Sequence, residues 1–124
     1  MAGTASLFAA VLLCLAGLIH SWLGERRLIG PLLAPGARHG LLETSGFARA
    51  TLRFAWHLTS IAWWGFAAVL LVAAQRPTDG RDISIVVAAT FIVTGLVTLY
   101  GSRGRHFSWP FFLAIGALAL APLF

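Results

Sequence analysis

The stretch Thr51-Leu-Arg53-Phe-Ala-Trp56-His57-Leu-Thr-Ser60-Ile-Ala-Trp63-Trp64-Gly65 decides how this sequence folds. It is long and apolar, yet it carries an arginine, a histidine and three tryptophans at helical spacing. Arg53, His57, Ser60 and Trp64 recur at i, i+4, i+7 and i+11, so they share one face of a helix. Ionisable side chains are costly inside a membrane and face the protein interior there. We therefore expect this face to form part of a polar pocket or a hydrogen-bonded seam between helices.

The composition of the whole chain agrees with a membrane location. Of its 124 residues, 59% are hydrophobic and 10% are charged, whereas a soluble domain has about 25% charged residues. A soluble fold of this length could not bury so much apolar surface, which predicts an integral membrane protein in contact with the lipid bilayer. The net charge of +5 comes from arginines between apolar runs, where basic residues meet lipid headgroups. Nucleic acid is therefore not an expected partner.

Four apolar runs predict an all-α fold, a polytopic four-helix bundle in a single domain, residues 1–124. The expected spans are residues 5–23, 47–74, 83–101 and 108–124, and each is compatible with the roughly 20 residues that a span needs. Residues 24–46 contain Pro31, Pro35, Gly36 and Gly40, which predict a connecting loop. Thr44 or Ser45, Asp82 and Ser108 are the expected helix caps.

The distribution of arginines predicts the orientation of the chain. Seven arginines flank the connections after the first and third spans: Arg26, Arg27, Arg38, Arg49, Arg53, Arg103 and Arg105. The connection after the second span holds only Arg76 and Arg81, beside Asp79 and Asp82. Because arginine-rich short loops remain cytoplasmic, we expect an inner-membrane protein with a cytoplasmic loop 24–46 and both termini on the outer, periplasmic side.

This topology places several chemically active residues at the same end of the bundle. His20 lies near the end of the first span, His57 lies a few turns into the second, and His106 precedes the fourth. The residues expected to line a site there are His20, Glu25, Arg53, His57, Trp64, Arg103 and His106. Glu25 is expected to neutralise one of four arginines: Arg26, Arg27, Arg53 or Arg103.

Three ligands are compatible with such a set. Two histidines from different helices could hold a haem whose propionates meet Arg53 and Arg103. His20, His57 and His106 could instead hold a transition-metal ion. A lipid, quinone or isoprenoid could place its polar head at the arginines. The histidines stand singly in the sequence, without the close pairs typical of metal sites, so these alternatives stay open.

Three segments, His20-Ser-x-x-Gly24-Glu25-Arg26, Thr51 to Gly65, and Gly104-Arg-His106-x-x-Trp109, resemble those of a group of small, uncharacterised four-span bacterial membrane proteins. The resemblance covers most of the chain and implies the same four spans. It also draws attention to His20, Glu25, Arg53, His57 and His106. It implies no substrate or cofactor.

The leading functional hypothesis is a small membrane binding protein with a His/Arg/Trp pocket at the cytoplasmic end. Its ligand would be a haem, a metal ion or an amphipathic cofactor or lipid. A second hypothesis is a structural or accessory subunit, packed as a homo-oligomer or in a larger membrane complex. A third is a small membrane enzyme with His57 or His20 as its base. The single cysteine, Cys14, lies within the first apolar run and is expected to pack there.

Overall fold

The computed structural model describes residues 2–36, 40–75 and 80–121, which form helices joined by turns, without a strand in those ranges. Four helices carry most of the fold: α1 (Ala2–Gly24), α4 (Gly46–Ala74), α5 (Gly80–Gly101) and α6 (Trp109–Leu120). Their bounds follow the four expected apolar runs closely, and the prediction of an all-α fold is confirmed. Arg38 and Arg76 lie outside the described residues.

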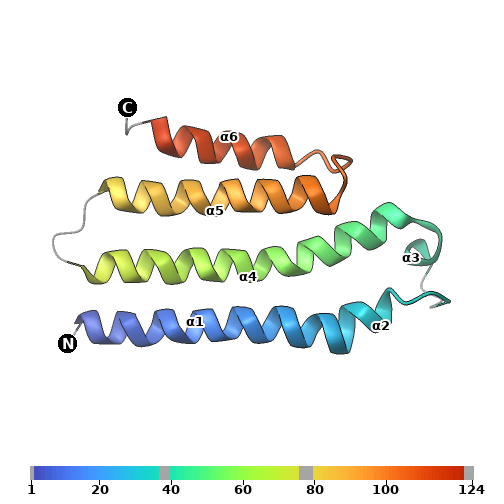
Figure 1. Ribbon diagram of the computed structural model, residues 1–124, viewed down its shortest axis with the longest axis horizontal. Coiled ribbons are helices and arrows are strands. Elements are labelled where there is room, and N and C mark those ends of the chain that lie inside the picture. The colour runs from blue at the N-terminus through green and yellow to red at the C-terminus, as the bar shows by residue number, and fades with distance from the viewer. Residues whose placement is uncertain (1, 37–39, 76–79, 122–124) are drawn as a thin grey trace.

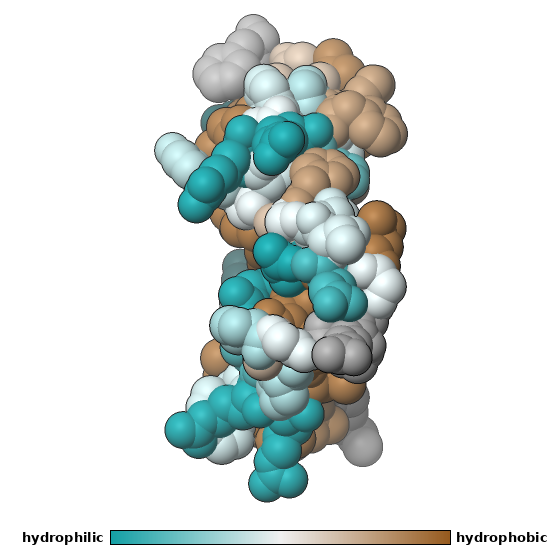
Figure 2. All heavy atoms as spheres, turned by 90° about the vertical axis from the view of Figure 1, so that its right-hand side faces the viewer, coloured by the Kyte–Doolittle hydropathy of each residue, from teal (hydrophilic) through white to brown (hydrophobic). Residues whose placement is uncertain are grey.

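The four helices lie side by side in a row that follows the chain (Figure 1). The order is α1, α4, α5 and α6, and extensive contacts join α1 to α4, α4 to α5, and α5 to α6. The molecule is narrow when viewed from its end (Figure 2), so the row is about one helix thick. As a result α1 and α6 lie at opposite edges, and large apolar residues on the outer side of α1 are exposed, among them Phe8, Leu12 and Trp22.

Three helical segments are long and apolar enough to cross a membrane: Ser6–Leu32, Gly46–Ala74 and Gly80–Gly101. Helix α6 is apolar but has only 12 residues. Helix α4 has 29 residues and is therefore about 43 Å long, against roughly 30 Å of hydrocarbon core. Its first turns, which carry Arg49 and Arg53, extend beyond what a span requires.

The chain remains helical beyond Gly24, where the sequence predicted a loop. The π-helix η1 (Glu25–Ile29) and the short helix α2 (Gly30–Leu32) continue α1. The backbone N–H of Gly30 donates to the carbonyl of Glu25, five residues back. Pro31 lies in the first turn of α2 and has no N–H to donate to the preceding turn, so a regular helical hydrogen bond is missing there. The wider π-turn thus lets a Gly-Pro pair follow a helix without ending it.

The helix caps differ in part from those expected. Ser45 caps α4, because its Oγ accepts a hydrogen bond from the backbone N–H of Ala48 at 3.1 Å. Ser108 occupies the N-cap position of α6, but its side chain makes no capping bond and instead contacts His106 Nδ1 at 2.8 Å. Asp82 lies inside the first turn of α5 rather than before it. The helix α3 (Leu41–Thr44) precedes α4.

The arginine-rich end of the row is the end where α1 finishes, α4 begins and α5 finishes (Figure 1). Hydrophilic residues spread over this end from the α6 side to the α1 side, with apolar residues between them (Figure 2). The fold therefore gathers η1, the first turns of α4 and the α5–α6 connection at one end. The candidate site lies there.

Candidate functional site

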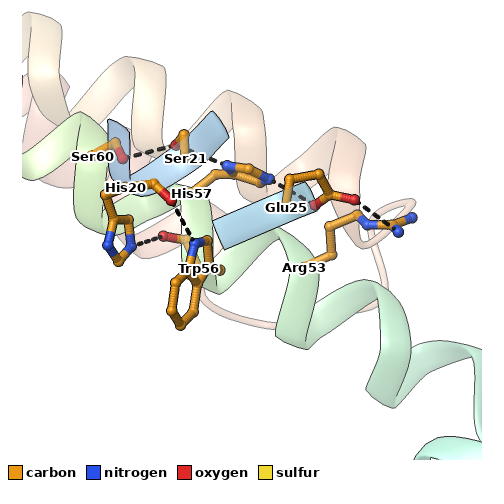
Figure 3. Close-up of polar contacts among 7 residues, drawn as sticks. All are labelled: His20, Ser21, Glu25, Arg53, Trp56, His57 and Ser60. Atoms are coloured by element: carbon orange, nitrogen blue, oxygen red, sulfur yellow. Dashed lines mark hydrogen bonds and ion pairs between the residues drawn. The ribbon is translucent and has the colours of Figure 1, made fainter. Parts of the chain in front are cut away.

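The polar face of α4 packs against α1, as the spacing of its residues predicted. Arg53 and His57 contact Glu25, and Ser60 contacts Ser21 (Figure 3). Farther along the helix, Ser60 also donates to the carbonyl of Gly17, and the Trp64 indole donates to the carbonyl of Cys14 at 3.2 Å. We call this contact the α1–α4 seam. Of the two expected uses of this face, the hydrogen-bonded seam is therefore present.

Hydrogen-bond donors follow a fixed order along the seam. The Ser60 hydroxyl is 1% exposed and donates to the carbonyl of Gly17 at 2.8 Å, so it can only accept from Ser21, at 2.8 Å. Ser21 in turn must accept from His57 Nδ1, at 2.9 Å. The order fixes Nδ1 of His57 as a donor.

Glu25 closes this chain at the end of the seam. One carboxylate oxygen lies 3.3 Å from His57 Nε2 and the other lies 3.0 Å from an Arg53 guanidinium nitrogen. The three side chains are about a third to a half exposed, so solvent screens their attraction. Their main effect is to hold Arg53 and His57 in place. Glu25 is also the first residue of the π-helix, a feature that is frequent at functional sites.

His20 lies in the same seam but makes different contacts. Its ring stacks on the Trp56 indole at 4.4 Å and meets the Trp63 ring edge-on at 5.0 Å. His20 Nε2 lies 3.3 Å from the carbonyl of Trp56, and the Trp56 indole donates to the carbonyl of His20 at 3.2 Å. His20 is therefore a packing residue that locks two helices together.

Two glycines allow α1 and α4 to approach this closely. A methyl group on Gly24 would overlap the Trp56 indole, and one on Gly17 would overlap the Trp64 indole. Small residues at such positions are typical of tightly packed membrane helices. The seam thus depends on paired glycine and tryptophan residues as well as on hydrogen bonds.

Arg103 and His106 lie in the α5–α6 connection, away from the seam. His106 packs on Phe47 and Phe54 of α4, with ring centroids 6.1 and 5.5 Å apart, and bonds Ser108. The structure therefore brings together His20, Glu25, Arg53 and His57, with Trp64 farther along, but it does not bring His106 to them.

The metal site expected at His20, His57 and His106 gains no support. Within residues 2–36, 40–75 and 80–121, no group of three His, Cys, Asp or Glu side chains is placed to hold a metal ion. Both ring nitrogens of His57 already contact Ser21 and Glu25. The same engagement leaves His57 without a free nitrogen for a haem iron.

The seam also argues against a Ser–His nucleophile pair. Glu25, His57 and Ser21 have the sequence of contacts seen in hydrolase triads, in which the histidine accepts the serine proton. Here the Ser21 proton is directed to Ser60 and the histidine donates to Ser21. The geometry fits a structural hydrogen-bond chain better than a catalytic base.

A pocket of about 810 Å³ opens on α4 and α5 beside the seam. Four arginines line it: Arg49, Arg53, Arg103 and Arg105. His57 also lines it, together with an apolar wall formed by Phe47, Phe54, Val93, Leu96, Val97 and Tyr100. Arg53 and His57 thus belong to both the seam and the pocket.

The sequence reasoning missed part of this site. Ser21 is the link between His57 and Ser60, yet a serine at a helix end gives little signal. From the sequence, Arg49 and Arg105 indicate only which end of the chain is cytoplasmic, and they are not predicted to line the site. Their position on the same end as Arg53 and Arg103 was visible in the sequence, and it could have marked all four as pocket residues.

No family model, curated protein or solved structure matches this chain. The resemblance to small four-span bacterial proteins therefore stays a prediction. Three helices of the described residues are long and apolar enough to cross a membrane, which indicates a membrane protein.

Proposed function

We propose that this chain is a small integral membrane binding protein that takes an amphipathic, lipid-like ligand into the arginine-lined pocket. The observation that carries the proposal is the division of the pocket lining. Its polar part consists mainly of four arginines near the helix ends, with His57 and Ser102, and most of the rest consists of apolar side chains on α4 and α5. An amphipathic molecule matches both parts, because its head would meet guanidinium groups and its tail would lie on the apolar wall.

The apolar wall fits a tail in the membrane. The C-terminal half of α5 contributes Val93, Leu96 and Val97 to the wall at helical spacing, and α4 contributes Phe54. Phe54 is only 6% exposed and Leu96 is 39% exposed, so the wall runs from the helix contact outward. A tail lying there would replace contacts that membrane lipids otherwise make.

The seam supports this role by holding one side of the pocket. Arg53 is paired with Glu25, and His57 is held between Glu25 and Ser21. Side chains fixed in advance lose less conformational freedom on binding. The hydrogen-bond chain is thus a scaffold that keeps Arg53 and His57 at the pocket edge.

The proposal places the pocket at the cytoplasmic face of an inner membrane. It keeps four spans, with residues 108–124 as the fourth, and both termini on the outer side. The support is the arginine excess at the end where η1, the start of α4 and the α5–α6 connection lie.

Filling the pocket tests this function. In Val97→Trp, the indole occupies space that the tail needs, and we expect the affinity for the amphipathic ligand to fall roughly tenfold, about 1.4 kcal/mol, so that less ligand co-purifies. Native mass spectrometry of the protein extracted in mild detergent measures the bound mass. Leu96→Trp provides a second filled pocket in case the first variant folds poorly.

Leu12→Trp is the matched control, because Leu12 is 66% exposed on α1 and does not line the pocket. It adds the same side chain to a lipid-facing surface, so ligand retention should equal that of the original protein. Equal retention in all the tryptophan variants would show that bound lipid is not held in the pocket.

The row of helices favours one second candidate, an accessory subunit of a homo-oligomer or a larger membrane complex. Helix α1 has α4 on one side only, and its outer residues Leu12, Leu15 and Ile19 are exposed. A stable assembly extracted from membranes and broken by Leu12→Trp, with unchanged ligand content, would favour this candidate.

A further inference from the structure

The pocket carries far more positive than negative charge. Among the residues that the structure describes, Arg53 is the one pocket arginine with a carboxylate partner, Glu25. Across the described part of the chain, no carboxylate lies within ion-pair distance of Arg49, Arg103 or Arg105. Arg49 is held by the backbone carbonyls of Leu42 and Glu43, at 2.8 and 3.1 Å. Arg49, Arg103 and Arg105 therefore give the pocket an excess of positive charge beside its apolar wall, which favours the binding of an anion.

The arginines come from two segments that are held at a fixed distance. Arg49 and Arg53 lie on α4, and Arg103 and Arg105 lie just after α5. Gly101 packs so closely on Phe54 that an added Cβ would lie 2.8 Å from the Phe54 Cβ. This close contact brings the end of α5 to α4 and places the two pairs of arginines around the same pocket.

The backbone N–H groups of residues 103–105, in the α5–α6 connection, are already hydrogen-bonded within the chain, so an anion bound there would be contacted by side chains. The N–H groups of Arg103, Gly104 and Arg105 donate to the carbonyls of Tyr100, Leu99 and Ser102, at 3.1, 2.8 and 3.1 Å. Arg103 has a φ of 52°, which non-glycine residues rarely adopt. Glycine adopts this conformation without strain, so the backbone itself does not favour an arginine here.

We infer that the head of the ligand is a phosphate with two negative charges, a phosphate monoester or a diphosphate on an apolar chain. The inference rests on the proposed function and names its ligand class. A planar guanidinium group can donate two parallel N–H···O hydrogen bonds to two oxygens of one phosphate. A monoester carries a charge of about −1.5 to −2 at neutral pH. This charge matches that of the three arginines without a carboxylate partner better than the single negative charge of a carboxylate or a phosphodiester does. A neutral quinone head would leave all three unmatched.

A series of lipids with the same tail and different heads tests this inference. Dioctanoyl phosphatidic acid, phosphatidylglycerol and phosphatidylcholine are titrated into the full-length protein in detergent at pH 8, where the monoester is fully charged. Phosphatidic acid should bind at least tenfold tighter than phosphatidylglycerol, and phosphatidylcholine should bind most weakly. Equal affinity of the first two would overturn the phosphate-dianion head and leave the amphipath pocket standing. Failure of all three to bind would contradict the proposed function itself.

Titrations with inorganic phosphate and pyrophosphate test whether the phosphate belongs to a lipid or is a free anion. If the ligand is a lipid, each should bind at least tenfold more weakly than dioctanoyl phosphatidic acid, because the apolar wall contributes nothing to a bare anion. If pyrophosphate binds as tightly as the lipid, the dianion head is upheld and a lipid source is contradicted.

Arg103→Gly separates the role of this side chain in binding from its role in folding. Glycine adopts the observed φ without strain, so the variant should unfold at the same temperature as the original protein or above it. Its affinity for dioctanoyl phosphatidic acid should fall roughly ten- to hundredfold. Arg27→Ala, which removes an arginine of η1 that does not line the pocket, should keep its affinity. An unchanged affinity in Arg103→Gly would contradict the inference.

Discussion

Gly24→Leu is expected to destabilise the protein by about 3 kcal/mol, the upper part of the range for overpacking a close contact. The new side chain would occupy the position of the Trp56 indole, which lies against Gly24. Moving that indole breaks its hydrogen bond to the carbonyl of His20 and its stacking on the His20 ring. Unfolding in mixed detergent, followed by circular dichroism, measures the change.

Gly80→Leu is the control for this substitution. Gly80 also lies in a helix of the described residues, but nothing stands within 4 Å of a Cβ added there. We expect its stability to be unchanged or slightly raised, because leucine favours a helix more than glycine does. Combining Gly24→Leu with Trp56→Ala should recover part of the loss, since the second change opens space. A fully stable Gly24→Leu protein would mean that α1 and α4 do not pack as described.

The second large effect is expected for Arg103→Gly combined with Arg105→Ala. Both residues line the pocket and neither has a carboxylate partner in the described ranges. Removing two charge-assisted contacts should lower the affinity for dioctanoyl phosphatidic acid by roughly 10² to 10⁴. Isothermal titration calorimetry in detergent at fixed salt measures it, and the remaining binding should depend less on salt than that of the original protein.

Arg26→Ala combined with Arg27→Ala removes the same charge from the same end of the molecule. These arginines belong to η1 and do not line the pocket. Their loss should change affinity by less than about threefold, because exposed charges at a distance are screened by salt. If both double variants lose affinity equally, the effect is one of net charge, and the pocket does not recognise the head.

Periodicity predicted the α1–α4 seam well, because it fixes which residues share a face. His57, Ser60 and Trp64 contact α1, and Arg53 contacts Glu25 of η1, which continues it. Glu25 was expected to pair with an arginine, and the pairing with Arg53 confirms one of the expected partners. Its contact with His57 was not expected, and the π-helix that begins at Glu25 leaves no pattern in the sequence.

The order of the helices across the membrane could not be read from the sequence. A closed bundle would have brought His20, His57 and His106 to one depth and one axis. In the row, His106 packs on α4 through Phe47 and Phe54, whereas His20 projects from α1 onto Trp56 of α4. The order in which the helices stand side by side decides which residues at one depth are in contact. A closed bundle would have joined the three histidines, whereas the row brings the arginines of α4 and of the α5–α6 connection to one pocket.

Photo-crosslinking tests the central claim most directly. The protein is placed in liposomes that contain a phosphatidic acid with a diazirine in its acyl chain, and the labelled peptides are identified by mass spectrometry. The account predicts adducts concentrated on Val93, Leu96 and Val97 of α5 and displaced by excess dioctanoyl phosphatidic acid. Adducts that follow exposure alone, as dense on Leu12, Leu15 and Leu18 of α1 as on α5 and unaffected by the competitor, would contradict it.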